Sequence, residues 1–269
     1  MARSVSNTNP DLMETLRWAY RAAIVIILLA GALYLFHETE QFLVSDSRFQ
    51  FAGPSEYGMD PAGLQIQGAA FASHKEIVSI FSQDYGKSLY LMPVADRREQ
   101  LLKLEWVKDA TVARFWPNQV LVRVEERVPV ALVHADEKRG WLVDAEGMLL
   151  RIPPQYKQNV PNVKGVNFRD SSTQRTERIK RMLRVMKDSG RHGERFTMVD
   201  VSDMDNVKVT LPVTERSITL WLGGRNFLSR LDGFENSFPR VHREMPADRI
   251  FDLRLDGRIS NVPDTEKGE

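Results

Sequence analysis

The sequence predicts an α+β protein with one N-terminal transmembrane helix followed by folded domains of strands and helices. The first observation is a run without charge, AAIVIILLAGALYLF, from Ala22 to Phe36. The second is that strand-like and helix-like periodicities alternate along the chain after Leu64. The third is composition: a net charge of +1 gives no bulk electrostatic attraction for nucleic acid, and the absence of cysteine excludes disulfides and thiolate metal sites.

The apolar run predicts a membrane span over residues 18–37, after a short cytoplasmic tail at residues 1–17. A helix needs about 20 mostly apolar residues to cross the hydrocarbon, and Arg21 near its end can reach the headgroups. Arg3, Arg17 and Arg21 precede the run, whereas the flank after it is mostly acidic. The positive-inside rule therefore places the N-terminus in the cytoplasm and the later domains on the outer side of the membrane, as in a single-pass type II membrane protein.

Two other interpretations of the run are a cleaved signal peptide and a buried helix of a soluble protein. A signal peptide has its small-x-small cleavage motif after the apolar stretch. Here the Ala-x-Ala sequence, Ala30 to Ala32, lies inside the stretch. The pattern therefore favours an uncleaved anchor.

Residues 38–63 are expected to form a juxtamembrane linker. Phe49 and Phe51 alternate around a glutamine, which indicates a short strand, and glycines and prolines then mark a loop. This segment is the expected hinge between the membrane and the first domain.

Residues 64–133 predict the order strand, helix, helix, strand, strand. Leu64 and Ile66 alternate with polar residues, and Ser73 with a glutamate three positions later forms the pattern of a capping box. Pro93 suits the first turn of a second helix. The residues on either side of the turn at Pro117 alternate in polarity, which predicts a hairpin with one buried face.

Residues 134–262 predict a second, mixed domain, followed by an unstructured tail at residues 263–269. A hairpin is expected around Gly147, and a basic amphipathic helix that Ser172 caps. Three strands and a shorter helix follow. Alternation from Ile250 to Asp256 then predicts a last strand, which the residues alone allow to be either an exposed sheet edge or an interior strand.

The hairpin block resembles the FtsQ/DivIB family of bacterial division proteins. Its matching residues are Gly68, Trp106, Val107, Trp116, Pro117, Asn118, Glu126, Arg127 and Pro129, continued by Val130 and Ala131. Asp144 and Gly147 match the hydrophobic-Asp-x-x-Gly hairpin turn of that family, and the late sequence Asp252-Leu253-Arg254 matches again.

This resemblance implies that residues 64–133 form a POTRA domain and residues 134–262 an FtsQ-type β domain that ends in a sheet-edge strand. It also implies that the division proteins FtsB and FtsL dock at the last strand. The partner-binding residues expected from it are Phe251, Leu253, Arg254, Leu255, Gly257 and Arg258.

No catalytic, cofactor or metal site is predicted. The sequence contains no P-loop, G-x-G-x-x-G or G-x-S-x-G motif. Its histidines, expected on the surface or at interfaces, are His37, His74, His134, His192 and His242, with no i, i+4 pair among them. Asp144 near Glu146 fits turn chemistry better than an acid–base pair. The basic run from Arg175 to Lys187 fits a solvated helix face, with binding to anionic lipid or polymer as the alternative.

The expected function is that of a non-enzymatic divisome protein that scaffolds septum formation by binding other division proteins, without a small-molecule substrate. One alternative is a polypeptide-binding POTRA component of export or outer-membrane assembly. That alternative predicts tandem POTRA copies or a following barrel. The other is a tethered cell-wall enzyme, which requires a polar cleft with perturbed carboxylates.

Overall fold

The computed structural model describes residues 10–54, 61–136, 139–213, 216–244 and 249–262. The predicted tail at 263–269 and the first nine residues of the predicted cytoplasmic tail lie outside this part. The chain divides into two compact units. Unit 1 comprises Met1–Gly68, Ser73–Leu101 and Ala110–Val124, and unit 2 comprises Ala69–Ala72, Leu102–Asp109 and Glu125–Glu269.

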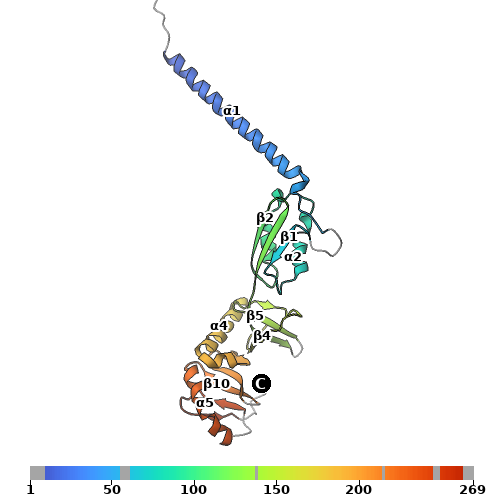
Figure 1. Cartoon of the computed structure of the whole chain (residues 1–269). Helices are drawn as coiled ribbons and strands as arrows, with labels where there is room; N and C mark the ends of the chain where they lie inside the picture. Colours follow the sequence, from blue (N-terminus) through green and yellow to red (C-terminus); the bar gives the residue numbers. More distant parts are fainter. Residues whose placement is uncertain (1–9, 55–60, 137–138, 214–215, 245–248, 263–269) are drawn as a thin grey trace, which may run out of the picture. The chain divides into compact units, whose positions relative to one another are not determined.

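The first element is α1, a single helix over Pro10–Ser45 (Figure 1). Its part from Met13 to Ser45 is long and apolar enough to cross a membrane, and none of its most apolar window is buried in the protein. The predicted span at 18–37 lies inside it. The helix continues beyond the span because the following residues, rich in Glu, Gln and Leu, are good helix formers.

The segment after α1 is packed onto unit 1. The Ser88 hydroxyl donates to the Leu43 carbonyl of α1 at 2.6 Å. Phe51 is fully buried, and its N–H donates to the Lys87 carbonyl at 2.9 Å. The strand expected at Phe49 to Phe51 is reduced to η1 (Ser47–Phe49) and a single bridge from Gln50 to Ser88. Residues 46–52, at the start of the expected hinge, are thus held against the domain.

The next elements confirm the predicted order of strand, helix, helix, strand and strand. A three-stranded sheet has the order β1-β3-β2, with β1 parallel to β3. Short 3-10 turns, η2 (Ser82–Asp84) and η3 (Leu89–Leu91), join the two helices. The main elements are β1 (Leu64–Gln67), α2 (His74–Ile80), α3 (Val94–Leu101), β2 (Val107–Phe115) and β3 (Gln119–Glu126).

Local sequence explains the boundaries of these elements. The Ser73 hydroxyl accepts the N–H of Glu76 at 3.3 Å, which caps α2 as the pattern predicts. Gly68 ends β1 with a φ of +82°, and a Cβ there would lie 2.2 Å from the Val124 carbonyl oxygen. Glycine is therefore required at this position by both its backbone conformation and the space available.

Unit 2 is built on a nine-stranded sheet of order β12-β11-β10-β9-β8-β7-β4-β5-β6. The predicted boundary between residues 133 and 134 falls inside β4, which pairs with β5 and β7 of this sheet. The strands are β4 (Pro129–Asp136), β5 (Arg139–Asp144), β6 (Leu149–Leu150), β7 (Asn162–Lys164), β8 (Met198–Asp200), β9 (Val207–Val213), β10 (Arg216–Gly223), β11 (Ile250–Asp252) and β12 (Ser260–Asn261).

Two helices, α4 (Ser172–Asp188) and α5 (Phe227–Glu244), pack on the sheet, with η4 (Gly190–Arg195) between α4 and β8. Ile179 and Met182 of α4 and Phe234 of α5 share one core with alternate residues of β9 and β10. The cap of α4 is Ser171 rather than the expected Ser172, because Ser171 forms a reciprocal capping box with Gln174.

The stability of unit 1 is expected to depend on a buried ion pair between Asp84 and Arg97. The Arg97 Nε and Nη2 atoms donate to the two carboxylate oxygens of Asp84 at 2.6 and 2.9 Å, and both side chains are buried. Asp84→Ala should lower the free energy of unfolding by about 3–5 kcal/mol, because it leaves a buried guanidinium without its partner.

Pulse proteolysis of the full chain in detergent over a urea series measures this change in the free energy of unfolding. The readout is the extent of cleavage within residues 73–101. The double variant Asp84→Leu, Arg97→Met is the control, since replacing both charges by apolar groups should cost much less. An Asp84→Ala variant as resistant as the parent would contradict the prediction.

Candidate partner-binding site

The two ends of the nine-stranded sheet differ. At the β6 end, the Trp106 Nε1 donates to the Arg151 carbonyl at 3.0 Å, and the Arg151 N–H donates to the Glu105 carboxylate. These contacts hold the backbone of Arg151, directly after β6. At the other end, β12 pairs with β11 on one side and is the terminal strand of the sheet in the described residues. A terminal strand of this kind is a template for pairing with another chain.

The predicted last strand is shorter than expected. β11 ends at Asp252, and the chain then turns through Gly257, with a φ of +77°, before β12 pairs back on β11. The N–H of Arg254 donates to the Asp252 carboxylate at 2.9 Å, which closes the turn directly after β11. Most of the expected partner-binding residues therefore lie in the β11–β12 connection, and the sheet edge itself is β12.

The six expected partner-binding residues fall into two groups. Phe251 and Leu253 are buried in the core, so they can support a partner site only by holding the strand in place. Leu255 is 64% exposed, and Arg258 is exposed beside it, with its N–H donating to the Leu255 carbonyl. Arg254 is exposed as well, so Leu255, Arg258 and Arg254 are the side chains that a partner can reach directly, while Gly257 offers only its backbone.

Arg254 links the connection to the open face of the sheet. Its guanidinium donates to both carboxylate oxygens of Asp252 and lies 5.0 Å from the ring of Trp221. The ammonium of Lys208 lies 4.3 Å from the same ring. The hydrogen bonds from Arg254 hold the pKa of Asp252 below its usual range. Asp252 is therefore ionised at neutral pH and orients Arg254.

A cavity of about 130 Å³ lies between α5 and the β11–β12 connection. Its lining includes Gly233 and Phe234 of α5 and the side chains of Leu253 and Leu255. Arg230 also lines it, and donates to Asp256 at 2.8 Å and to the carbonyls of Leu222 and Arg254. The cavity is large enough to receive a single apolar side chain from a strand placed along β12.

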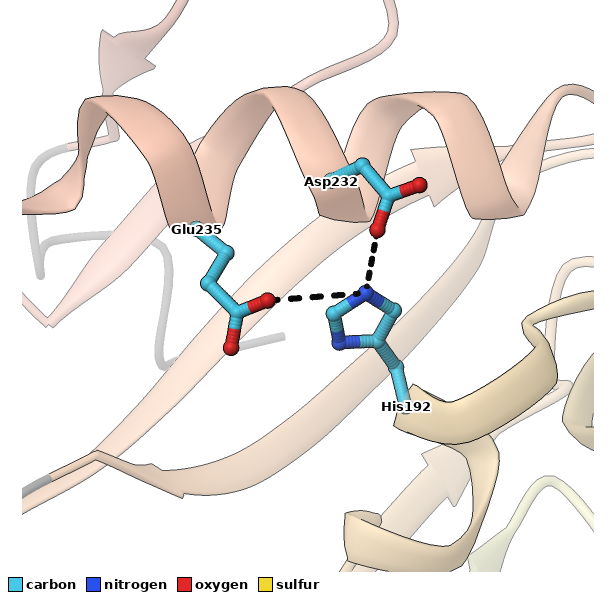
Figure 2. A group of neighbouring side chains, drawn as sticks. All are labelled: His192, Asp232 and Glu235. Atoms are coloured by element: carbon cyan, nitrogen blue, oxygen red, sulfur yellow. Dashed lines mark hydrogen bonds and ion pairs between the residues drawn. The ribbon is translucent and has the colours of Figure 1, made fainter.

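A second cluster, which the sequence did not predict, joins η4 to α5. His192 is buried, and its Nε2 lies 2.9 Å from Asp232 Oδ1 and 4.0 Å from Glu235 Oε2 (Figure 2). This histidine and its two carboxylates have the composition of a metal site. However, Arg191 donates to the same two oxygens at 3.0 and 2.9 Å, and Arg195 donates to Glu235 at 3.1 Å. The cluster is thus an ion-pair network that ties α5 to η4.

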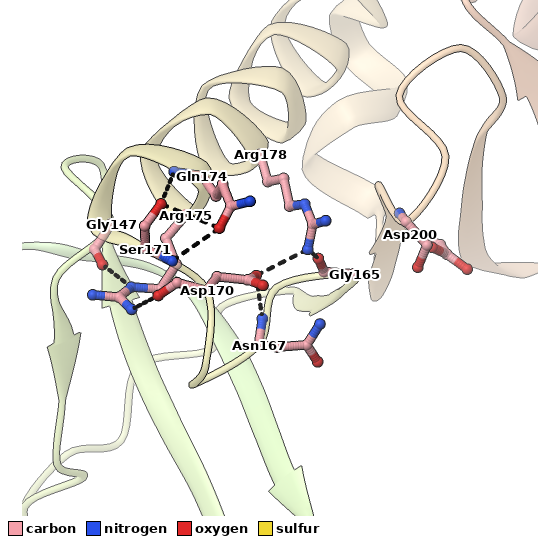
Figure 3. Close-up of polar contacts among 10 residues, drawn as sticks. Gly147, Gly165, Asn167, Asp170, Ser171, Gln174, Arg175, Arg178 and Asp200 are labelled. Carbon is pink, nitrogen blue, oxygen red and sulfur yellow. Dashed lines mark hydrogen bonds and ion pairs between the residues drawn. The ribbon is translucent and has the colours of Figure 1, made fainter.

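The arginines of the basic helix α4 are largely used within unit 2. Arg175 donates to the carbonyls of Gly147 and Asp170, and Arg178 donates to the Asp170 carboxylate and the Gly165 carbonyl (Figure 3). Arg181 donates to the carbonyls of Met204 and Gly224. These contacts hold the loops around α4. They account for the arginines of the helix without a bound ligand and without solvation as the only explanation.

The family-motif residues at the start of β2 and the end of β3 meet within unit 2. Trp106 and Val107 are buried, and Trp106 packs on Phe71 at 5.0 Å between ring centroids. Glu126 accepts the N–H groups of Phe71 and Ala72 at 2.7 and 2.6 Å. By contrast, Trp116 is 46% exposed in the β2–β3 turn, where a cis peptide joins it to Pro117 ahead of Asn118. These motif residues thus have structural roles, except for those in the exposed β2–β3 turn.

The predicted turn at Asp144 is a polar junction. Asp144 Oδ1 accepts the N–H groups of Glu146 and Met148, and its Oδ2 accepts from Arg127 at 2.7 Å. Gly147 has a φ of +80°, and Pro129 pairs with Asp144 across β4 and β5. Asp144 is therefore the acceptor that holds the turn, and these contacts of its carboxylate are structural.

Comparison with known proteins gives the same assignment for the first domain. Residues 62–127 match the model of the FtsQ-type POTRA domain. The cell division protein FtsQ of Koribacter versatilis (strain Ellin345) is 30% identical over 208 residues, which cover 75% of this chain and 60% of that protein. The chain thus resembles FtsQ proteins over three quarters of its own length, and it spans 60% of the length of the Koribacter protein. The FtsQ of Syntrophotalea carbinolica (strain DSM 2380 / NBRC 103641 / GraBd1) is 23% identical, covering 73% of this chain and 71% of that protein.

The sequence patterns did not predict the His192 network because its members are far apart in the sequence. His192 and Asp232 are separated by 40 positions. A local signal was present: Asp232 and Glu235 are three residues apart on one helical face, and a basic stretch precedes β8. That signal indicates an ion-pair network only when η4 and α5 are known to be neighbours.

The His192 network predicts an acid-dependent stability of unit 2. The hydrogen bond from His192, with the positive charge of Arg191, holds the pKa of Asp232 below its usual range. A lowered folded-state pKa gives stability that is present above the unfolded-state value of about 3.9 and is lost as the pH falls through the folded-state value. Asp232→Asn should therefore reduce the loss of thermal stability below about pH 4. Melting curves of parent and variant between neutral and acidic pH test this, and identical acid profiles would refute it.

Proposed function

We propose that this chain is a non-enzymatic, single-pass division protein of the inner membrane that scaffolds septum assembly. The observation that carries the proposal is the match to a cell division protein FtsQ over 208 residues, more than the POTRA domain alone contains. The proposed mechanism is assembly: α1 confines the chain to the membrane, and its folded units present surfaces to other division proteins.

The proposed orientation has the N-terminus in the cytoplasm and both units in the periplasm. It follows from Arg17 and Arg21 at the amino end of the span, against Glu38 and Glu40 after it. Addition of protease to intact spheroplasts tests it: the folded units should be cleaved from outside. Full protection of both units would reverse the assignment.

The proposed partners are FtsB and FtsL, which would dock at the β12 end of the sheet. At the opposite end of the sheet, Trp106 holds the chain directly after β6, whereas β12 is a terminal strand in the described residues and lies beside the exposed Leu255. Strand addition there would supply main-chain hydrogen bonds, while the cavity beside Leu255 would select a side chain. Leu255 and Arg258 are the proposed contact residues, with Arg254 and Gly257 shaping the turn and Phe251 and Leu253 supporting it.

Leu255→Lys should weaken binding of an FtsB–FtsL pair about tenfold or more, because an exposed apolar contact beside the β12 edge is replaced by a charge that the partner would have to desolvate. The measurement is the affinity of the full chain in nanodiscs for the purified ectodomains. Gly257→Pro is unsuitable as a test, since proline cannot adopt the positive φ of Gly257.

Val128→Lys is the matched control. Val128 is 70% exposed, close to the 64% of Leu255, but it lies beside β4, five places from β11 in the sheet order. We expect this variant to bind as the parent does. Equal affinities for all three proteins would contradict the β12 site, and no binding by the folded parent would favour the export or outer-membrane assembly alternative.

A further inference from the structure

The exposed apolar side chains of unit 1 gather at one place. Among the described residues of unit 1 beyond the span, the large apolar side chains that are exposed are Phe42, Leu91, Phe115 and Trp116. They are 48, 57, 61 and 46% exposed and come from α1, η3, the end of β2 and the β2–β3 turn. We call these four residues the juxtamembrane patch.

Ring contacts and a hydrogen bond connect the members of this patch. Phe49 stacks edge-on against Phe42 at 5.5 Å and against Trp116 at 5.7 Å. η3, which contains Leu91, contacts α1, and Arg114 beside Phe115 donates to the Met92 carbonyl at 2.6 Å. The four side chains therefore form one surface around the end of α1.

The position of this surface along α1 matches the edge of a bilayer. The span at 18–37 is about 30 Å long at 1.5 Å per residue, which equals the hydrocarbon thickness. Phe42 follows His37, the last residue of the span, by five positions, or about 7.5 Å of helix. The headgroup layer on each side is about 5–7 Å thick, so Phe42 lies at its outer limit. Tryptophan and tyrosine are enriched at this level, and tryptophan, phenylalanine and leucine form the membrane-facing side of interfacial helices.

The connection between α1 and the POTRA fold keeps the patch at this level. The hydrogen bond from Ser88 to Leu43 and the buried Phe51 hold residues 43–51 against the domain. A free linker would let the domain leave the membrane surface, whereas this contact keeps η3 and the β2–β3 turn beside the helix end.

We propose that the juxtamembrane patch inserts into the outer headgroup layer, so that the FtsQ-type POTRA domain contacts lipid directly. Large exposed apolar patches mark membrane or protein contacts, and here the bilayer is the surface that α1 brings to the patch. Charges near it are balanced, with Arg48, Lys87 and Arg114 against Glu38, Glu40 and Asp46. The contact with the membrane therefore depends on insertion of apolar side chains rather than on attraction to anionic lipid. A membrane of phosphatidylcholine alone should be sufficient for the patch to bind.

Depth measurement by spin labelling tests the proposal, because the chain has no cysteine and a single one can be introduced at will. Phe115→Cys carries the nitroxide in the patch. Thr111→Cys, exposed on the same face of β2, places it four residues or about 13 Å further along the strand. In phosphatidylcholine nanodiscs, the label at 115 should be accessible to oxygen and shielded from a nickel chelate, and the label at 111 should show the reverse.

This inference rests on the proposed membrane anchoring, and a third label separates the two. Leu29→Cys lies within the span, so a water-exposed label there would defeat the anchoring itself. If the label at 29 is in lipid but the label at 115 is as exposed to water as the label at 111, the patch proposal is overturned. The patch would then be expected to bind a protein instead of lipid. Leu91→Asp, which alters an exposed residue, should move the label at 115 toward water while the circular dichroism spectrum stays unchanged.

Discussion

The packing of the end of α1 onto the POTRA fold is the constraint on which the arrangement of unit 1 depends. A single hydroxyl, that of Ser88, donates to the Leu43 carbonyl, and the buried ring of Phe51 fixes the chain that follows. The segment between membrane and domain thereby becomes part of the domain. Because the helix confines the chain to the membrane plane, this contact decides which surface of unit 1 meets the lipid.

Unit 2 depends on a different constraint, the continuity of one sheet through nine strands. Its two terminal strands are separated by eight spacings, or roughly 38 Å at 4.8 Å per strand. Next to one terminal strand, β6, Glu105 and Trp106 hold the backbone of Arg151. The arginines of α4 and the His192 network stabilise the helical layer over the sheet, so most of these charges form contacts within unit 2. The proposed recognition surface of this unit is the β12 end with Leu255.

Much of this fold follows from local sequence, and the differences have physical causes. The span, the cap at Ser73 and the hairpin at Pro117 each depend on neighbouring residues, so the patterns predicted them. The alternation from Ile250 to Asp256 predicted one long strand, but the Asp252 carboxylate binds the N–H of Arg254 and ends β11 early. The His192 network needs residues 40 positions apart, which no local pattern specifies. The partner site is the part least determined by sequence, since it depends on which strand ends the sheet.

Hydrogen–deuterium exchange of the full chain in nanodiscs, with and without the FtsB–FtsL pair, tests the central claim most directly. If the chain is an assembly protein that binds through the β12 end of its sheet, the amides of residues 250–262 should be protected by the partner, and those of β5 and β6 should not change. Protection confined to the β2–β3 turn, or no protection anywhere with both partners folded, would contradict this account.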